Sequence, residues 1–262
     1  MESKESRYSL LQGFKSDFLR NGYCKVEFSD ISKLLSIKHL VQLSIESSIE
    51  AVATTDKSLA LEDLHTILNR QNINADRLHA IEQLQRTGDF NKALYLDPLP
   101  DLFQSLIGHD ILIQKHVNLV IQRPGDADNS ELHRDAPANS EFEIVVWVPF
   151  VDCSSDMSLF ILNLETTANC LSELRKSSGS NWPQVKAKIE NEAVPIPVNF
   201  GEALIFMTPL YHGSKVNTGL STRVSTNFRV RSMFAPSGLK DSLNFWEILV
   251  ISPFTKNVCQ FF

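Results

Sequence analysis

The stretch that decides the fold runs over residues 114–122 and reads QKHVNLVIQ. Its apolar side chains fall on one face: Val117, Leu119 and Ile121. Its amide and imidazole side chains fall on the other: Gln114, His116, Asn118 and Gln122. Alternation with a period of two predicts a β-strand with one buried face. A strand with amides on its second face suits a sheet that walls a polar cavity.

The sequence on either side of this stretch defines the fold class. Before residue 111 the apolar residues recur at helical spacing, as in Leu10, Leu11, Phe14 and Phe18, and Ser29-Asp30 offers a helix cap. A short strand is expected over residues 23–28. Further strands are expected over residues 142–150, 157–162, 194–198, 203–206 and 222–231. Short strands after a helical start predict an α+β protein, a β-sandwich or jelly roll flanked by helices.

We interpret residues 1–262 as a single domain. It has a mostly helical flank over 1–110, a β core over 111–235 and an extension over 236–262. A polar, mostly helical insertion over 164–193 interrupts the core, and it is either a lid over a site or a surface decoration. The apolar C-terminal segment 245–254 is expected to pack within the chain, with a homodimer contact as the alternative.

Composition excludes several classes of function. The net charge of −6, without any block of Lys or Arg, argues against a nucleic-acid partner. Residues 1–6 do not resemble a secretory signal, and no apolar run is long enough for a membrane span. The cysteines form no C-x-x-C pair, which argues against a zinc ribbon and favours free thiols: Cys24, Cys153, Cys170 and Cys259. These features predict a cytoplasmic protein whose partner is a small molecule.

A metal site is predicted by His133-Arg134-Asp135 together with His212. In an extended segment residues i and i+2 point to the same side, so His133 and Asp135 can share a ligand. Two imidazoles and one carboxylate can occupy one face of an iron(II) ion and leave the opposite positions open. An isolated histidine is more often structural, but the order H-x-D followed by a distant His-Gly-Ser favours the metal.

Arg223 follows His212 by 11 residues, on a strand that also carries Ser225, Asn227 and Arg229 on the same face. The guanidinium of Arg223 could bind a carboxylate through two hydrogen bonds, and Ser225 could add a hydroxyl donor. The alternative is an arginine at the surface or at the end of a barrel. For Arg229, substrate contact and a structural salt bridge are both open. Together with the metal ligands, these residues indicate an oxygenase that uses iron and a dicarboxylate co-substrate.

At these residues the chain resembles a known family. The order of residues 133–135, 212–217 and 222–225 is similar to that of iron(II)/2-oxoglutarate-dependent dioxygenases of the phytanoyl-CoA hydroxylase-like superfamily. The closer resemblance is to members found in bacterial carbohydrate and streptomycin-type biosynthetic clusters. Residues 18–23, 147–150 and 252–255 also fit, whereas 45–105 and 164–193 match no pattern of the family.

The resemblance implies a double-stranded β-helix, or cupin-like jelly roll. Iron(II) would be bound by His133, Asp135 and His212, with O₂ as the oxidant. The far carboxylate of 2-oxoglutarate would be held by Arg223 and Ser225. Polar candidates for co-substrate or substrate contacts are Gln122, Asn118 and Asn217, and further candidates for the substrate are Asn227, Arg229 and Trp147. Halogenases of this group lack the ligand carboxylate, so Asp135 favours hydroxylation or a related oxidation.

The expected substrate is a small polar metabolite, a sugar or sugar nucleotide by the subgroup resemblance. An amino acid or a natural-product intermediate is the alternative for the same chemistry. Two other classes remain open: a cupin-like sugar-binding or isomerase protein, and a catalytically silent scaffold. A scaffold would typically have lost a ligand or the arginine, and this chain keeps all four residues.

Overall fold

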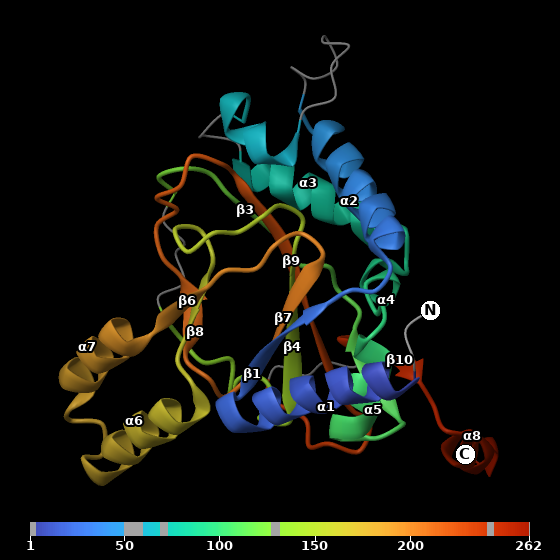
Figure 1. Ribbon diagram of the computed structural model, residues 1–262, viewed down its shortest axis with the longest axis vertical. Coiled ribbons are helices and arrows are strands. Elements are labelled where there is room, and N and C mark those ends of the chain that lie inside the picture. The colour runs from blue at the N-terminus through green and yellow to red at the C-terminus, as the bar shows by residue number, and fades with distance from the viewer. Residues whose placement is uncertain (1–3, 50–59, 69–72, 127–131, 240–243, 262) are drawn as a thin grey trace.

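The computed structural model describes residues 4–49, 60–68, 73–126, 132–239 and 244–261. Helices dominate up to residue 107, interrupted by one strand (Figure 1). In chain order these elements are α1 (Lys4–Asn21), β1 (Tyr23–Glu27), α2 (Ile31–Glu46), the 3-10 helix η2 (Leu61–Thr66), α3 (Ile73–Arg86), α4 (Phe90–Ala93) and α5 (Leu99–Ile107).

The remaining chain is mostly strand. Its elements are β2 (Ile111–Gln114), β3 (Leu119–Gln122), β4 (Glu143–Pro149), β5 (Leu159–Ile161), α6 (Leu164–Lys176), α7 (Trp182–Glu192), β6 (Val194–Ile196), β7 (Glu202–Met207), β8 (His212–Ser214), β9 (Arg223–Ser232), β10 (Trp246–Val250), α8 (Pro253–Val258) and the 3-10 helix η3 (Cys259–Phe261). This mixture of helices and antiparallel strands agrees with the predicted α+β class.

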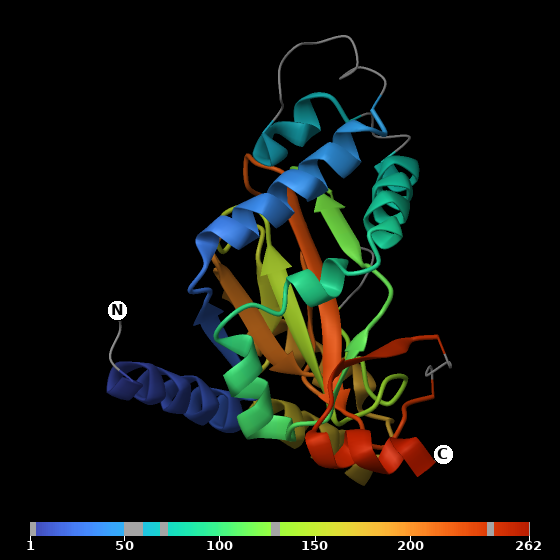
Figure 2. The same ribbon diagram turned by 90° about the vertical axis from the view of Figure 1, so that its right-hand side faces the viewer.

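Two antiparallel sheets form the β core in the described part of the chain. The larger sheet has the order β1-β7-β4-β9-β2-β10, and β3 pairs with β9 beside β2. The smaller sheet has the order β6-β5-β8. Helices α2 to α5 lie over one face of the larger sheet, as Figure 2 shows. Because helices cover one face and the other faces the molecular interior, β4 is buried along its whole length.

Local sequence signals explain several element boundaries. Asp30 caps α2 by accepting a hydrogen bond from the Lys33 amide, as predicted. At the end of α1, Gly22 adopts a left-handed φ of 81°, and a Cβ there would lie 2.9 Å from the Leu210 side chain. The carbonyl of Gly22 accepts a hydrogen bond from Met207. This tight turn therefore brings β1 directly alongside β7.

The structure corrects the expected strand over residues 114–122. The chain forms two separate strands, β2 and β3, which both pair with β9, and residues 115–118 leave the sheet between them. The Asn91 amide stabilises this break by donating to the carbonyls of Gln114 and His116. The prediction of one continuous strand is therefore wrong at His116, which lies in the break and is exposed.

The C-terminal segment packs within the chain, as preferred from the sequence. Strand β10 pairs with β2 at the edge of the larger sheet. The helical insertion is also as predicted, with α6 and α7 forming a pair to one side of the sheets (Figure 1). No helix in the described ranges is long and apolar enough to cross a membrane.

Candidate metal centre and adjoining cavity

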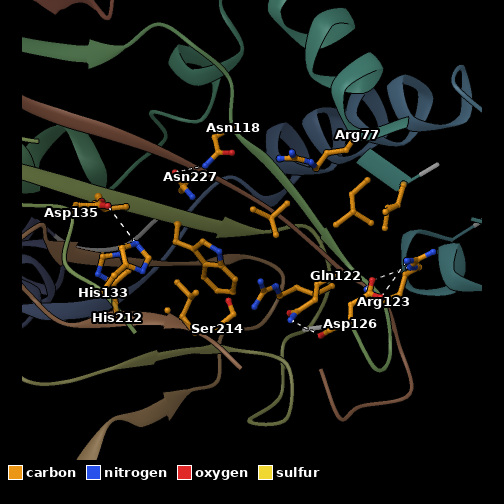
Figure 3. A pocket seen from close by; sticks show the side chains of 18 of the residues that line it. Arg77, Asn118, Gln122, Arg123, Asp126, His133, Asp135, His212, Ser214 and Asn227 are labelled. Carbon is orange, nitrogen blue, oxygen red and sulfur yellow. Dashed lines mark hydrogen bonds and ion pairs between the residues drawn. The ribbon is translucent and has the colours of Figure 1, made fainter. Parts of the chain in front are cut away.

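The structure brings His133, Asp135 and His212 together. One potential ligand atom of each lies within 4.8 Å of the others. His133 and His212 face each other across an isolated β-bridge, with each backbone amide donating to the other residue's carbonyl at 2.8 Å. The Asp135 amide donates to the Thr208 carbonyl at 3.2 Å. Backbone pairing, rather than a loop conformation alone, therefore sets the spacing of the three side chains (Figure 3).

Hydrogen bonds orient two of these side chains. The Nδ1 atom of His212 lies 2.9 Å from the Leu210 carbonyl oxygen, a geometry that suits an Nδ1–H donor and leaves Nε2 as the ligand. Arg229 Nη2 donates to Asp135 Oδ2 at 2.7 Å. The other carboxylate oxygen, Oδ1, lies 3.7 Å from His133 Nε2. Each residue thus presents one donor atom toward the shared point, an arrangement that fits a divalent metal ion.

The electrostatics keep two of the donors unprotonated. Burial alone would raise the pKa of Asp135, but the interaction with the His133 ring and the charge of Arg229 hold this pKa well below its usual range. Desolvation lowers the pKa of His212 to about 4. Metal ligands must be deprotonated to bind. At neutral pH both side chains are therefore in the state that a metal requires.

Arg229 lies behind Asp135 and does not line the cavity. Its Nη1 donates to Gln114 Oε1 at 3.1 Å, and its Nε lies 3.8 Å from Oε2 of the buried Glu143. The guanidinium therefore bridges the sheet and the carboxylate ligand. Of the two roles left open for this residue by the sequence, its contacts correspond to the structural salt bridge.

A cavity of about 540 Å³ adjoins the three side chains (Figure 3). Both sheets line it, since β4 contributes Trp147, β7 contributes Phe206 and β8 contributes Ser214. Helix α3 of the N-terminal flank closes another part of the wall through Arg77. This volume lies within the range of small-molecule sites, roughly 300–1,000 Å³.

Arg223 lines the same cavity and is 1% exposed. Its Nη1 donates to the Met157 carbonyl at 3.1 Å, which fixes the guanidinium against the wall. Two hydroxyl groups, Ser225 Oγ on the same strand and Ser214 Oγ on β8, are buried and have no hydrogen-bond partner among the described residues. Ser214 lines the cavity, whereas Ser225 is not among the lining residues. A buried guanidinium with nearby hydroxyl groups is suited to binding a carboxylate.

The other predicted contact residues divide into two groups. Trp147, Asn118, Gln122 and Asn227 line the cavity. The Gln122 amide nitrogen donates to backbone carbonyls of Asp126 and Lys215. Asn217 is completely buried outside the cavity wall, where its side chain bonds the backbone of Gln122, Ser221 and Gly219. The contacts of Asn217 thus shape the turn between β8 and β9.

The helical insertion is absent from the cavity wall as far as the described residues define it. Its apolar side chains, including Val185 and Ile189, pack with Leu162 and Tyr211 in a separate small core. Tyr211 immediately precedes His212, so the insertion supports the strand that carries this histidine. Among the described residues, no side chain of 164–193 takes the position of a lid.

Sequence reasoning missed Ser214 and Arg77 as cavity residues. A signal for Ser214 was present, because it lies two residues after His212 on a strand and therefore points to the same side. No comparable signal existed for Arg77, since its helix precedes the β core and matches no pattern of the family.

The chain was compared with known proteins. Neither a protein-family model nor a curated protein sequence matches it. Solved structures do match. They include a non-heme monooxygenase, ThoJ, in complex with nickel, at 13% identity over 92% of this chain and 85% of that chain, with a TM-score of 0.57. AviO1 from Streptomyces viridochromogenes Tue57 matches at 15% identity over 90% of this chain and 100% of that chain, with a TM-score of 0.55.

A third similar structure is SnoN, a non-heme alpha ketoglutarate dependent epimerase from nogalamycin biosynthesis. It matches at 14% identity over 95% of this chain and 91% of that chain, with a TM-score of 0.51. At such identities the similarity is one of fold. The chain therefore has a fold found among non-heme oxygenases, including alpha ketoglutarate dependent enzymes.

Proposed function

We propose that this protein is a non-heme iron(II)/2-oxoglutarate-dependent dioxygenase that oxidises a small polar metabolite. The observation that carries the proposal is the convergence of His133, Asp135 and His212 on one point of a cavity that Arg223 also lines. The similar structures support it at the level of fold. In this proposal the two sheets form the double-stranded β-helix of the phytanoyl-CoA hydroxylase-like superfamily.

Iron(II) would be held by His133, Asp135 and His212. When bound, it supplies oxygen activation coupled to the oxidative decarboxylation of 2-oxoglutarate. The protein contributes orientation: Leu210 fixes the His212 ring, and Arg229 fixes the Asp135 carboxylate. Because Asp135 supplies a carboxylate ligand, hydroxylation or a related oxidation is favoured over halogenation.

Arg223 would bind the far carboxylate of 2-oxoglutarate. The hydroxyls of Ser225 and Ser214, for which the described residues provide no hydrogen-bond partner, would donate to the same group. We assign Trp147 and Asn227 to the substrate side of the cavity.

The proposed enzyme is one catalytic unit. Its cavity is lined by α3 of the N-terminal flank as well as by both sheets, so the helical flank and the β core depend on each other. A sugar or sugar nucleotide is the first substrate class to test, and amino acids or natural-product intermediates are the second. A cytoplasmic location is part of the same proposal.

The test is succinate release that depends on iron(II), oxygen and 2-oxoglutarate, measured across a panel of these metabolites. We expect His212→Ala to abolish succinate release and Arg223→Met to raise the 2-oxoglutarate concentration that it requires. His109→Ala and Arg20→Met, which alter exposed residues away from the cavity, should match the wild type. Metal binding without any 2-oxoglutarate consumption would contradict the proposal and favour a cupin-like sugar-binding or isomerase protein.

A further inference from the structure

Besides Arg223 and the ion-paired Arg123, the cavity wall carries Arg77, which the chemistry above does not use. Arg77 lies on α3, is half-buried and lines the cavity wall. In Figure 3 its guanidinium extends toward Asn118 and Asn227. Among the described residues it makes a hydrogen bond from Nη1 to the Leu119 carbonyl at 3.3 Å. This bond uses one of its five N–H donors.

The other charged side chains of the cavity have counter-charges. Asp126 accepts from both Arg123 Nε at 2.9 Å and Arg123 Nη2 at 3.2 Å. Asp135 is paired with Arg229 and would bind the metal. The two carboxylates of 2-oxoglutarate would balance the positive charges of the metal ion and of Arg223. Arg77, in contrast, forms no ion pair with any acidic residue in the part of the chain that the structure describes.

A pair of amides lies next to Arg77. Asn118 Nδ2 donates to Asn227 Oδ1 at 3.1 Å, and both residues line the cavity. No hydrogen bond among the described residues uses Asn118 Oδ1 or Asn227 Nδ2. The fixed pair therefore offers one acceptor and one donor, which suits a hydroxyl or amide group of a ligand.

We propose that the substrate is an anionic metabolite whose carboxylate or phosphate is bound by Arg77, with a hydroxyl or amide group held by Asn118 and Asn227. This inference rests on the proposed function, because it assigns 2-oxoglutarate to Arg223. A carboxylate or phosphate matches an arginine in a cavity wall more closely than a neutral group does, since it can accept two parallel hydrogen bonds from the guanidinium. A neutral sugar would supply no counter-charge to this guanidinium, and the described residues supply none.

The binding test uses protein loaded with zinc(II), which has no redox chemistry, and 2-oxoglutarate, so that the metal site and Arg223 are occupied. The side-chain Nε–H signals of labelled arginine are followed by NMR, and Arg77→Lys identifies the Arg77 signal. We expect this signal to shift saturably with inorganic phosphate or acetate and to be unaffected by glycerol. Arg86, an exposed arginine on the same helix, is the internal control. An Arg77 signal that responds to neither anion, or no more than that of Arg86, would overturn the inference.

The activity test compares metabolites of one carbon skeleton with and without a phosphate or a carboxylate. We expect only charged members to stimulate succinate formation, and the group that does so identifies the anion. Arg77→Met should raise the concentration required by on the order of 10–100-fold, the usual effect of losing a charge-assisted bond. Arg86→Met should have no effect. Equal stimulation by the neutral members would refute the anionic substrate while leaving the dioxygenase intact. A complete lack of 2-oxoglutarate consumption would instead refute the proposed function, and the NMR result would still decide whether Arg77 binds anions.

Discussion

Replacing Arg229 tests whether the contacts behind the metal site determine its affinity. Arg229→Gln removes the 2.7 Å bond to Asp135 Oδ2, between side chains that are 16% and 13% exposed. A charge-assisted hydrogen bond of this kind contributes about 1.5–3 kcal/mol, which corresponds to roughly 10–100-fold in metal affinity. Loss of a positive charge beside the metal ion should strengthen metal binding, which offsets part of this effect. We therefore expect the lower end of the range, about tenfold weaker binding of iron(II).

The assay is an anaerobic titration of iron(II) or cobalt(II) in competition with a chelator, at a temperature where every variant is folded. Arg229→Gln also removes the cation 3.8 Å from the buried Glu143, so its unfolding free energy should fall by roughly 3 kcal/mol. Arg231→Gln is the matched control, because Arg231 is a buried arginine on the same strand that contacts Pro236 and Trp246. Equal metal affinity in the two variants would refute the anchoring role of Arg229.

Three further outcomes follow from the same structure. Arg223→Met should raise the 2-oxoglutarate concentration for half-maximal succinate release by about 10–100-fold, while the iron(II) dissociation constant stays near that of the wild type. In the metal-free protein, the pKa of His212 is about 4 when the chain is folded and near 6.5 when it is unfolded. The unfolding free energy should therefore fall by up to about 3 kcal/mol as the pH drops from about 6.5 to 4. In urea titrations, His212→Asn should remove this contribution. Iodoacetamide should modify the exposed Cys259, whereas Cys24 and Cys153, whose pKa burial raises to about 12, should react only after unfolding, as mass spectrometry can establish.

Much of the β core could be predicted because its strands have simple patterns. Apart from Glu143, residues 142–150 are apolar, and the corresponding β4 is buried on both faces. On β9 the alternation of polar and apolar residues placed Arg223 and Asn227 correctly on one face, which the structure shows as part of the cavity wall. Such predictions succeed where a strand's period alone determines which face is buried.

The remaining features depend on tertiary contacts that no local pattern encodes. The break between β2 and β3 is stabilised by Asn91, a residue from a distant helical segment. The position of Arg77 depends on how α3 packs against β3, which its helical period does not specify. The contacts of Arg229 with Asp135 and Gln114 likewise join segments that are far apart in the sequence. Contacts between segments distant in sequence were therefore the main limit of prediction.

The orientation of the insertion shows the same limit. Its polar composition and its position between strands were compatible with both a lid and a decoration. The structure packs its apolar side chains beside Tyr211, behind the strand of His212. The choice between a lid and a decoration thus depends on which neighbour buries these side chains, and the sequence does not specify that neighbour.

The central claim is that His133, Asp135 and His212 bind one metal ion. Crystals grown without oxygen and soaked in iron(II) allow the most direct test, because anomalous diffraction at the iron edge locates the ion itself. We predict a single strong peak within bonding distance of one nitrogen of each histidine and one oxygen of Asp135. A fully soaked crystal with no anomalous peak among these three side chains would contradict the account.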